Sequence, residues 1–494
     1  MWLSQLLERN HLCFADRVAL VDERRSVTWQ EFAERTAELA KGFVDLGIRP
    51  GDRVAVLSQD RIEVLESYFA LARLGALFVP LNYSLSGPEV TDIVERVGAV
   101  VVLGEATLLE RHMPLPECVR FCMAFDKLPF TSVGTVTASA DLPVVADSKP
   151  VAVLHTSATT GQAKGVTVDE GSLRAIGLGW LAAVSPDDDI VMVNCCPLYH
   201  GSMVISLTYM AAGATVVLLA GFTPQKALEA VAQHRATHMW LVPQMLRFML
   251  QAKAFDSTDL SSLREILYGA APMPPGVYAD AVARLGCGFR QVYGMTEVGG
   301  PFMTLGPGEH PAPGDVGARI PCGRVIPGMS ARAVDQQGRQ LPCGEIGEVV
   351  VRGPGAMQGY WNDPQATEEV VLDGWIRTGD LGFFDKDGRI HLVDRCKDLI
   401  IRAGQNVYPS EIERVLMAHP AVQDAAVVGI PDDDYGELPL AYVVADDGTD
   451  DQTLLGHLAE NLAPYKRPRT ITFIDQVPRN PAGKIIKKML RARP

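Results

Sequence analysis

Short apolar runs alternate with segments of helical periodicity along the first half of the chain, and this alternation limits the possible folds more than any other feature. A buried strand of a parallel sheet is a short apolar run, whereas an amphipathic helix repeats its apolar residues about every 3.6 positions. The pattern predicts strands over residues 54–57, 77–80, 100–103, 151–155, 190–195 and 215–219, and helices over 27–46, 64–74 and 224–234. We therefore predict an α/β fold with doubly wound, mostly parallel sheets.

The pattern of apolar segments and turn residues changes in the last third of the sequence. From Gly344 onward, strand-like segments such as 345–352 and 375–378 are punctuated by Gly, Asp and Pro, which predicts a β-rich lobe after the parallel sheets. Further on, a capping box of Ser410 and Glu413 predicts a helix over 411–418. The remaining pattern predicts strands over 422–430, 441–445 and 471–474 and a helix over 454–462. These features predict two domains, a large one over 1–396 and a small α+β domain over 397–494.

Composition and charge exclude several classes of function. Apolar residues make up 47% and charged residues 21% of the 494 positions, as in a compact globular protein. The net charge of −14 argues against a nucleic-acid partner. The nine cysteines follow neither a zinc spacing nor a disulfide framework, so we expect a reduced, cytoplasmic setting.

One uncharged segment, residues 203–222, is long enough to suggest a membrane helix. Gly213 divides this segment into a part with helical spacing and a run, Ala-Thr-Val-Val-Leu-Leu, that is typical of a buried parallel strand. The start of the chain carries Glu8 and Arg9 and lacks the apolar core of a signal peptide. We therefore expect neither a membrane span nor a secretion signal.

The most informative segment runs from Leu154 to Gly165 and reads Leu-His-Thr-Ser-Ala-Thr-Thr-Gly-Gln-Ala-Lys-Gly. A strand that leads into a loop of Thr, Ser and Gly, closed by a lysine, offers hydroxyls, N–H groups and a cation to a polyphosphate. The spacing differs from that of the common P-loop, and such a loop taken alone is often an ordinary surface turn. The candidate phosphate-binding residues are Thr156, Ser157, Thr159, Thr160, Gly161 and Lys164.

Further motifs follow this loop in order. They are Pro197-Leu-Tyr-His200, Gly269-Ala-Ala-Pro272, Tyr293-Gly-Met-Thr-Glu297, the stretch 344–353, Thr378-Gly-Asp380, Asp394-Arg395, Gly404-Gln-Asn406 and Pro478-Arg-Asn-Pro-Ala-Gly-Lys484. With this ordered set, the chain resembles the adenylate-forming superfamily, in its acyl-CoA synthetase branch, over nearly its whole length. The resemblance implies an acid–thiol ligase that passes through an acyl-AMP and makes an acyl-CoA thioester. It also implies ATP or acyl-AMP, Mg²⁺ and coenzyme A as the small molecules that bind.

The resemblance gives roles to the residues around the nucleotide. Tyr293 would stack on adenine, because an aromatic face is a good platform for a purine. Thr296 would contact phosphate, and Glu297 would hold Mg²⁺, a hard cation that prefers carboxylate oxygen. Asp380 would accept hydrogen bonds from the ribose hydroxyls, with Arg395 assisting. Outside these motifs, a core aromatic, a solvated acid and an ordinary surface aspartate would be the simpler interpretations.

Four further residues are assigned by the same resemblance. Lys484 would bridge the substrate carboxylate and the α-phosphate, where a cation stabilises the charge that develops as pyrophosphate leaves. Lys397 matches the hinge, because one placement of the C-terminal domain cannot bring both Lys484 and the CoA tunnel to the same acyl group. Gly404 would line the pantetheine tunnel, where the absence of a Cβ lets a thin chain pass. His200 matches a gate between the acyl pocket and the tunnel.

The residues expected around the acyl group are small or apolar and include no evident cation. A bulky, uncharged carboxylic acid therefore fits better than a dicarboxylate, and fatty, aromatic and polycyclic acids all stay open. The expected acyl pocket contains Ser202, Met203, Trp240, Gly294, Gly299 and Gly300, and the expected nucleotide site also contains Gly269 and Ala270.

The chain departs from the family's usual phosphate loop, Thr-Ser-Gly-Thr-Thr-Gly-x-Pro-Lys-Gly, at Ala158 and Ala163. Ala158 adds a methyl group where the backbone approaches phosphate or takes up a glycine conformation, at a cost of roughly 1–2 kcal/mol. An acyl-AMP lacks the β- and γ-phosphates, so the change should weaken ATP-dependent adenylation more than thioester formation.

Several interpretations of the function therefore stay open. The chain could be a complete ligase, or a ligase that receives its acyl-AMP from a separate adenylating enzyme. It could also load a separate carrier protein. A non-catalytic acyl-nucleotide binder is harder to reconcile with the retained Glu297, Asp380 and Lys484.

Overall fold

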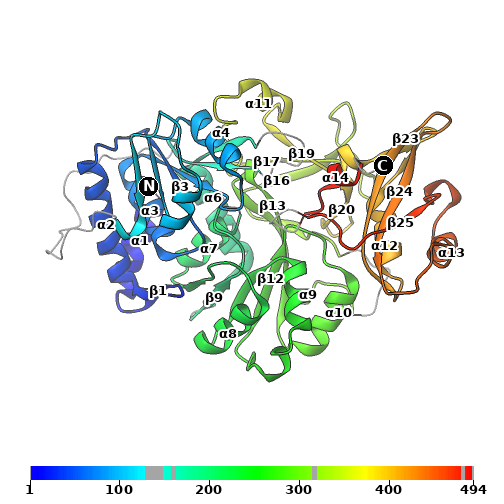
Figure 1. The fold of residues 1–494 in the computed structure, drawn as a ribbon, viewed down its shortest axis with the longest axis horizontal. Helices are drawn as coiled ribbons and strands as arrows, with labels where there is room; N and C mark the ends of the chain where they lie inside the picture. Colours follow the sequence, from blue (N-terminus) through cyan, green and yellow to red (C-terminus); the bar gives the residue numbers. More distant parts are fainter. Residues whose placement is uncertain are drawn as a thin grey trace.

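The computed structural model of the protein describes residues 2–127, 148–156, 163–187, 189–199, 201–313, 320–479 and 484–491. Two large sheets of mostly parallel strands and a β lobe form the N-terminal part, and a separate sheet with its own helices forms the C-terminal part (Figure 1). This arrangement confirms the predicted α/β fold with large parallel sheets, a β-rich lobe and a smaller C-terminal unit.

The first large sheet has the strand order β6-β5-β3-β4-β7-β8. Its strands are β3 (Arg53–Leu57), β4 (Leu77–Leu81), β5 (Val101–Gly104), β6 (Phe121–Ala124), β7 (Pro150–His155) and β8 (Gly165–Asp169), with helices α3 (Ile62–Leu74), α4 (Gly87–Val97) and α5 (Ala106–Arg111) between them. The last two strands are antiparallel, and His155 pairs with Gly165. The predicted phosphate loop therefore connects the two strands of a hairpin.

The second large sheet has the order β15-β14-β13-β12-β11-β9-β10-β1-β2. Its strands are β1 (Val18–Val21), β2 (Ser26–Thr28), β9 (Val191–Asn194), β10 (Thr215–Leu218), β11 (His238–Leu241), β12 (Glu265–Gly269), β13 (Gly288–Met295), β14 (Gly300–Leu305) and β15 (Arg324–Val325). The helices around it are α1 (Trp2–Phe14), α2 (Trp29–Asp45), α6 (Glu170–Val184), α7 (Ser202–Ala211), α8 (Pro224–His234), α9 (Pro243–Gln251) and α10 (Pro275–Arg284).

The uncharged segment 203–222 divides at Gly213, as predicted. Gly213 follows α7 with a positive φ of 81°, and β10 then pairs in parallel with both β1 and β9. No helix in the described part of the chain is both long and apolar enough to cross a membrane.

The predicted start of the first amphipathic helix is two residues too early. Val27 is buried and belongs to β2, which pairs with β1. α2 begins at Trp29 because Thr28 and Glu31 form a capping box that satisfies the first free N–H groups of the helix.

The β lobe is built from β16 (Ser330–Val334), β17 (Gly347–Arg352), β18 (Val371–Leu372), β19 (Trp375–Phe384) and β20 (Ile390–Arg395), with α11 (Pro364–Val370) beside it. Its strand pairs are all antiparallel. The pairing of β19 with β20 sets Asp380 directly opposite Arg395.

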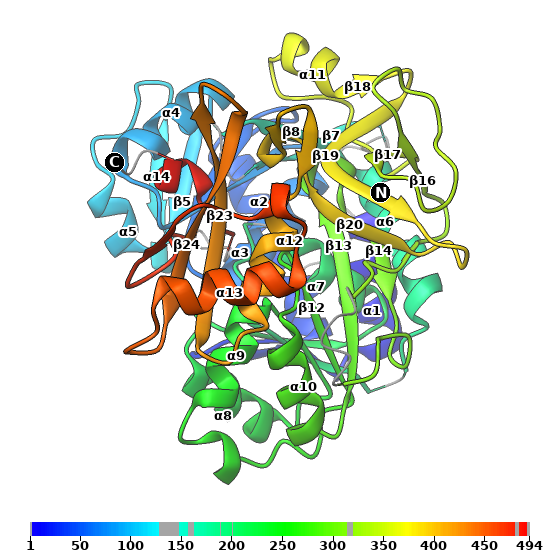
Figure 2. The same cartoon turned by 90° about the vertical axis from the view of Figure 1, so that its right-hand side faces the viewer.

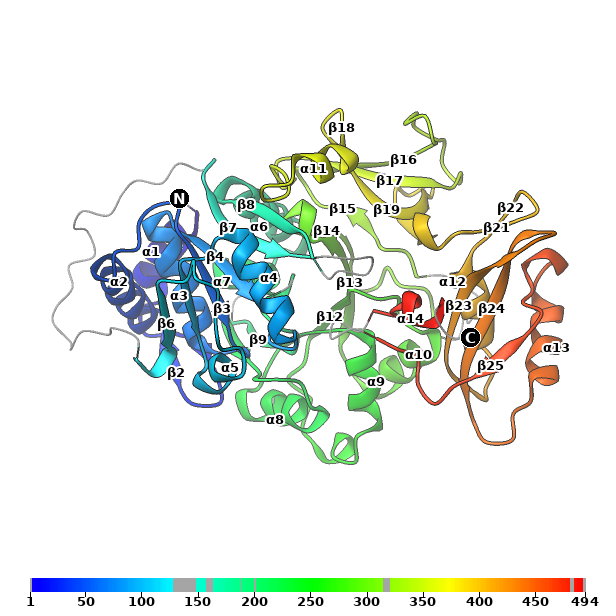
Figure 3. The ribbon, with the colours of Figure 1, turned by 45° about the horizontal axis from the view of Figure 1, so that its top comes forward.

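The C-terminal part contains β21 (Ile400–Arg402), β22 (Gln405–Val407), α12 (Pro409–Met417), β23 (Val422–Asp432), β24 (Gly436–Ala445), α13 (Asp451–Asn461), β25 (Ile471–Phe473) and α14 (Lys487–Arg491). Its strands form one sheet with separate apolar clusters. α13 lies on the outer side of this sheet, toward the viewer in Figure 2, while α14 lies on the side turned toward the N-terminal part (Figure 3). The domain limit at Lys397 stays a prediction.

The capping box predicted for Ser410 and Glu413 is wrong. α12 begins at Pro409, because proline fits the first helical position, where no N–H is needed. The Glu413 carboxylate instead accepts a hydrogen bond from Val427 N at 2.8 Å and pairs with Lys487 at 2.9 Å. Glu413 therefore connects α12 to the last helix of the chain.

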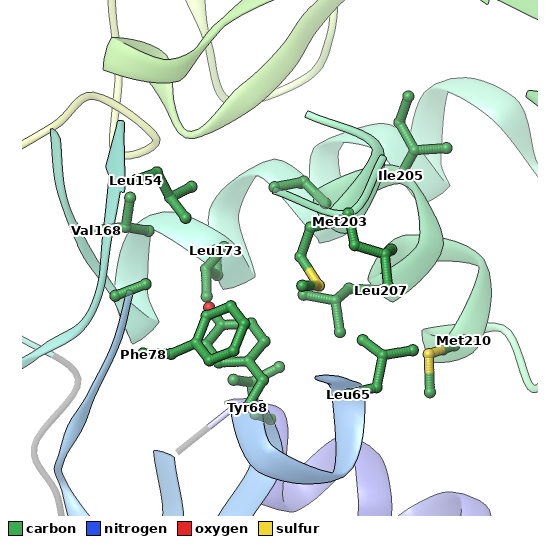
Figure 4. Close-up of a cluster of buried hydrophobic side chains, with 14 of the residues drawn as sticks. Leu65, Tyr68, Phe78, Leu154, Val168, Leu173, Met203, Ile205, Leu207 and Met210 are labelled. Atoms are coloured by element: carbon green, nitrogen blue, oxygen red, sulfur yellow. The ribbon is translucent and has the colours of Figure 1, made fainter. Parts of the chain in front are cut away.

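The largest apolar cluster joins α3, α6, α7 and the parallel sheets. Figure 4 shows Met203 and Leu207 of α7 beside Leu65 and Tyr68 of α3. Met203 is 1% exposed and Leu207 is fully buried. The side chains of α7 are therefore closely packed in the core of the N-terminal part.

Candidate active site

Three residues from distant parts of the sequence converge on one carboxylate. The Tyr293 hydroxyl, at the end of β13, donates to Asp380 Oδ2, and Arg395 Nε lies 2.9 Å from Asp380 Oδ1. Asp380 is only 7% exposed, whereas the Arg395 side chain that pairs with it is 42% exposed. We refer to Tyr293, Asp380 and Arg395 as the Asp380 cluster.

The charges within the Asp380 cluster stabilise one another. Burial and the neighbouring Asp380 raise the pKa of Tyr293 well above its usual value, so its hydroxyl stays protonated and donates. Burial works against the charge of Arg395, yet the attraction of Asp380 leaves the pKa of its guanidinium raised. A carboxylate has about four acceptor positions, so Asp380 keeps capacity for the two ribose hydroxyls that the sequence predicts.

The two ends of the predicted phosphate loop meet. Thr156 N donates to Lys164 O at 3.0 Å, and Lys164 N donates to Thr156 Oγ1 at 3.3 Å. The Lys164 ammonium lies 4.9 Å from the centre of the Tyr360 ring. Other predicted residues of this loop, Ser157, Thr159, Thr160 and Gly161, lie outside the described residues together with Ala158, and their roles stay predictions.

Glu297 lies in the short helical turn η3 (Thr296–Val298), directly after β13. Its Oε1 accepts a hydrogen bond from the Tyr360 hydroxyl at 2.9 Å. Within the described ranges, no three His, Cys, Asp or Glu side chains gather into a group that could hold a metal ion. A single carboxylate suits Mg²⁺, which keeps several waters and binds largely through substrate phosphates. Glu297 and Thr296 therefore fit a phosphate-bound Mg²⁺.

Lys484 comes from the C-terminal part and reaches the same region. Burial lowers the pKa of Lys484, and Arg395 and Lys397 lower it further, while the attraction of Asp380 and Glu297 opposes the shift. A lysine that is partly desolvated beside two carboxylates gains most when an anionic group binds next to it. The structure thus brings Lys484 together with the Asp380 cluster and Glu297.

Gly404 and Lys397 both lie in exposed turns, and the charge of Lys397 acts on Lys484. Gly404 is exposed in the turn between β21 and β22, has a φ of +78°, and a Cβ there would meet open space. Lys397 lies exposed in the turn η4 (Cys396–Asp398), which connects the β lobe to the C-terminal sheet. His200 lies outside the described residues. The roles of all three residues stay predictions.

Gly269 and Ala270 have backbones that restrict their side chains. A Cβ on Gly269 would lie 2.3 Å from Val292 O and 3.1 Å from Trp240 Cη2, so the position admits glycine alone. Ala270 has a φ of +64°, which costs a residue with a Cβ about 1–2 kcal/mol. The structure thus places Trp240, Gly269 and Ala270 together at the end of β12.

The other residues of the predicted acyl pocket divide into two groups. Gly294 of β13 pairs with Pro301 of β14, and a Cβ on Gly294 would lie 2.3 Å from Gly300 O. Gly299 precedes this contact with a φ of +72°. Ser202 begins α7 and donates its hydroxyl to a loop carbonyl, whereas the Met203 side chain points into the apolar cluster of Figure 4. Their pocket role stays a prediction.

A cavity of about 700 Å³ lies between α9 and the C-terminal sheet. Its lining includes Asp60, Tyr83, Cys195, Pro197, Met245, Gln423, Val477 and Arg479. Arg247 Nη1 of α9 donates to Gln423 O at 2.8 Å and joins the two parts of the chain at its edge. None of the predicted site residues that the structure describes is among those that line this cavity.

Asp60 is a buried acid in the wall of this cavity that the sequence did not reveal. It is 4% exposed, and its Oδ1 accepts a hydrogen bond from Leu198 N at 2.8 Å. Burial raises the pKa of Asp60 to about 8, against the lowering effect of the Leu198 hydrogen bond. Asp60 therefore holds the backbone of Leu198 while keeping its own proton at neutral pH.

The contribution of Asp60 to stability should fall as the pH rises from about 4 to about 8, because the native state keeps the Asp60 proton that the unfolded chain has lost. The slope from this one group reaches at most about 1.4 kcal/mol per pH unit. Asp60→Asn keeps an oxygen for Leu198 N and removes the titration, so its free energy of unfolding should depend less on pH. Urea unfolding curves at pH 6, 7 and 8 measure the difference. The control is Asp433→Asn, a change at an exposed acid. The assignment would be contradicted if the free energy of unfolding fell equally with pH in the wild type, in Asp60→Asn and in Asp433→Asn.

Comparisons with known proteins show the family of the chain. Residues 7–361 match the family described as AMP-binding enzyme, and residues 411–484 match the AMP-binding enzyme C-terminal domain. A feruloyl-CoA synthase of Amycolatopsis sp is 37% identical over 95% of this chain and 94% of its own length. The fatty acid–[acyl-carrier-protein] ligase ScoC of Streptomyces coeruleorubidus is 35% identical over 96% and 93%.

A solved structure is also similar over the full length. The o-succinylbenzoate CoA synthetase MenE of Bacillus subtilis, in complex with its acyl-adenylate intermediate, has a TM-score of 0.86 and 29% identity and covers 99% of this chain and 98% of its own. The comparisons define an adenylate-forming acid–thiol ligase, a class whose members use ATP or AMP and Mg²⁺. The chain belongs to the AMP-binding enzyme family, including the C-terminal domain of that family.

Proposed function

We propose that the chain converts a bulky, apolar carboxylic acid, through its acyl-AMP, to the acyl-CoA. The observation that carries this proposal is the convergence of Lys484, from the C-terminal part, on the Asp380 cluster and Glu297. This constellation combines a polar holder for a nucleoside with a cation beside the position where phosphate charge develops.

The two half-reactions use these residues differently. In the first, a carboxylate oxygen of the acid attacks the α-phosphorus of ATP, and pyrophosphate leaves. Lys484 would offset the charge of the carboxylate and the α-phosphate, and Asp380 would fix the ribose. Mg²⁺, held by Glu297, would supply positive charge to the phosphates. In the second half-reaction the CoA thiol attacks the acyl carbon, and AMP leaves.

The acid is best sought among uncharged aromatic and aliphatic compounds. Glycines, Trp240 and Met203 dominate the predicted pocket, and they offer no cation for a second carboxylate. Relatives act on related acids, since they include a feruloyl-CoA synthase and an indoleacetate–CoA ligase, which is 34% identical. A panel of aromatic, fatty and dicarboxylic acids, assayed for CoA thioester formation, tests this choice, and a preference for dicarboxylates would overturn it.

ATP-dependent adenylation is the weaker half-reaction in this proposal, because Ala158 stands where the family usually has glycine. Ala158→Gly should raise pyrophosphate exchange by about tenfold, which corresponds to roughly 1.4 kcal/mol. Turnover of supplied acyl-AMP with CoA should stay unchanged, since that step needs no polyphosphate. Ala163→Gly, in the same loop, is the matched control. If the wild type already exchanges pyrophosphate at the rate of Ala158→Gly, the loop tolerates the methyl group.

A wild type that uses acyl-AMP but exchanges no pyrophosphate would favour an external adenylating enzyme as the source of the acyl-AMP. A second candidate acceptor is a carrier protein, and the similarity to the fatty acid–[acyl-carrier-protein] ligase favours it. Supplying acyl-AMP with either CoA or a phosphopantetheinylated carrier protein distinguishes the two acceptors. Faster transfer to the carrier protein would replace CoA in the proposal.

A further inference from the structure

The loop between β17 and α11 is fixed against the strand that follows the phosphate loop. Tyr360 forms an antiparallel bridge with Val166 of β8, and Trp361 N donates to Gly165 O at 2.7 Å. On its other side, Tyr360 N donates to Thr367 Oγ1 at 2.9 Å. Main-chain contacts therefore fix the position of Tyr360 relative to the base of the phosphate loop.

The Tyr360 side chain contacts two oppositely charged groups at once. Its hydroxyl donates to Glu297 Oε1 at 2.9 Å, and its ring faces the Lys164 ammonium at 4.9 Å from the centroid. The side chain is buried, with 9% of the residue exposed. Because an ionised carboxylate can only accept, the Tyr360 hydroxyl is the donor in this contact.

We propose that Tyr360 is a positioning residue of the adenylation half-reaction, which orients Glu297 for Mg²⁺ and holds Lys164 for the polyphosphate. This inference rests on the proposed function. Donation to Oε1 fixes the rotation of the carboxylate and leaves Oε2 as the oxygen for a cation, as partners behind metal ligands do in other sites.

The aromatic ring explains why a tyrosine suits this position better than a direct contact of the two charges. A Lys164–Glu297 ion pair would occupy both charges with each other. A ring face attracts the ammonium without taking up its N–H donors in hydrogen bonds, so Lys164 can stay over the ring while these donors contact a polyphosphate. Tyr360 thus keeps both groups near the phosphates without neutralising either.

The test measures binding of α,β-methylene-ATP, which cannot be cleaved at the bond used in adenylation, by calorimetry over a range of Mg²⁺ concentrations. Tyr360→Phe keeps the ring and removes the hydroxyl. It should raise the Mg²⁺ concentration for half-maximal binding by about tenfold, as expected when a partner behind a metal ligand is lost. Binding of AMP, which lacks the β- and γ-phosphates, should stay at the wild-type value.

Two further variants sharpen the result. Tyr360→Leu removes the ring as well, so analogue binding in the presence of a chelator should also weaken, by roughly two- to fivefold. Tyr442→Phe is the matched control, because it removes a tyrosine hydrogen bond of 2.9 Å, to Leu490 O, inside the C-terminal part. It should leave the Mg²⁺ dependence unchanged.

An unchanged Mg²⁺ dependence in Tyr360→Phe overturns the inference, and so does an equal shift in Tyr442→Phe or a wild type that does not respond to Mg²⁺. If Tyr360→Phe does not fold, Thr367→Val carries the test, because it loosens the Tyr360 backbone and should shift the Mg²⁺ dependence in the same direction. Conversion of acyl-AMP and CoA by the wild type is measured in parallel. If the wild type fails to convert acyl-AMP and CoA, the proposed function is overturned. The calorimetry then still decides whether Tyr360 contributes to Mg²⁺ binding.

Discussion

Replacing Lys484 with alanine is expected to abolish formation of acyl-AMP from acid and ATP, with a loss of at least about a hundredfold, while thioester formation from supplied acyl-AMP continues. The large effect follows from the position of Lys484, which lies partly desolvated beside Asp380 and Glu297. A charge that stabilises the transition state of one step contributes to that step alone. Pyrophosphate exchange measures the first half-reaction, and CoA ligation from synthetic acyl-AMP measures the second.

Lys488→Ala is the control for this experiment, because Lys488 is exposed on α14. Both half-reactions should proceed normally in the control. An equal loss of both half-reactions in Lys484→Ala would remove Lys484 from the adenylation step.

Gly404→Leu is expected to have the opposite effect and to reduce CoA ligation by about a hundredfold or more, while pyrophosphate exchange stays at the wild-type rate. The Asp380 cluster does not involve the exposed turn of Gly404, so a larger side chain there should leave adenylation intact. A leucine would fill the predicted pantetheine tunnel once the C-terminal part turns about Lys397. The same pair of assays gives the answer.

The φ of +78° at Gly404 means that any side chain strains the turn. Gly448→Leu separates this strain from the tunnel effect, because Gly448 is also exposed, has a φ of +88° and also faces open space. If Gly448→Leu lowers CoA ligation as much as Gly404→Leu does, backbone strain explains the loss and Gly404 is not in the tunnel.

The fold was predictable because its signals are local. A parallel strand buried on both faces must be an apolar run. Gly213 lies between the end of α7 at Ala211 and the start of β10 at Thr215, and so marks the change from helix to strand. The order of the motifs likewise indicated the nucleotide residues, and the structure places Tyr293, Asp380 and Arg395 in contact.

The errors and omissions arise where a residue takes its partner from a distant segment. Glu413 has the spacing of a capping residue from Ser410, but its carboxylate pairs with Lys487, far along the chain. Tyr360 follows a glycine and precedes a tryptophan, a context typical of a core aromatic, and its contacts with Glu297 and Lys164 depend on the bridge to Val166. Asp60 follows a strand like many solvated acids, and its raised pKa comes from burial in the folded protein, against the lowering effect of the Leu198 hydrogen bond.

The mutual contacts of the Asp380 cluster have a thermodynamic consequence for ligand binding. Tyr293 and Arg395 are each held by one oxygen of the same buried carboxylate. Ordering a free side chain at a binding site costs about 0.5–1.5 kcal/mol of entropy, and here the protein's own folding has already met that cost for two large side chains. The entropy change on binding an adenosine group should therefore come mainly from ordering of the ligand and from movement between the two parts of the chain. The residues that hold the ribose should contribute little to it.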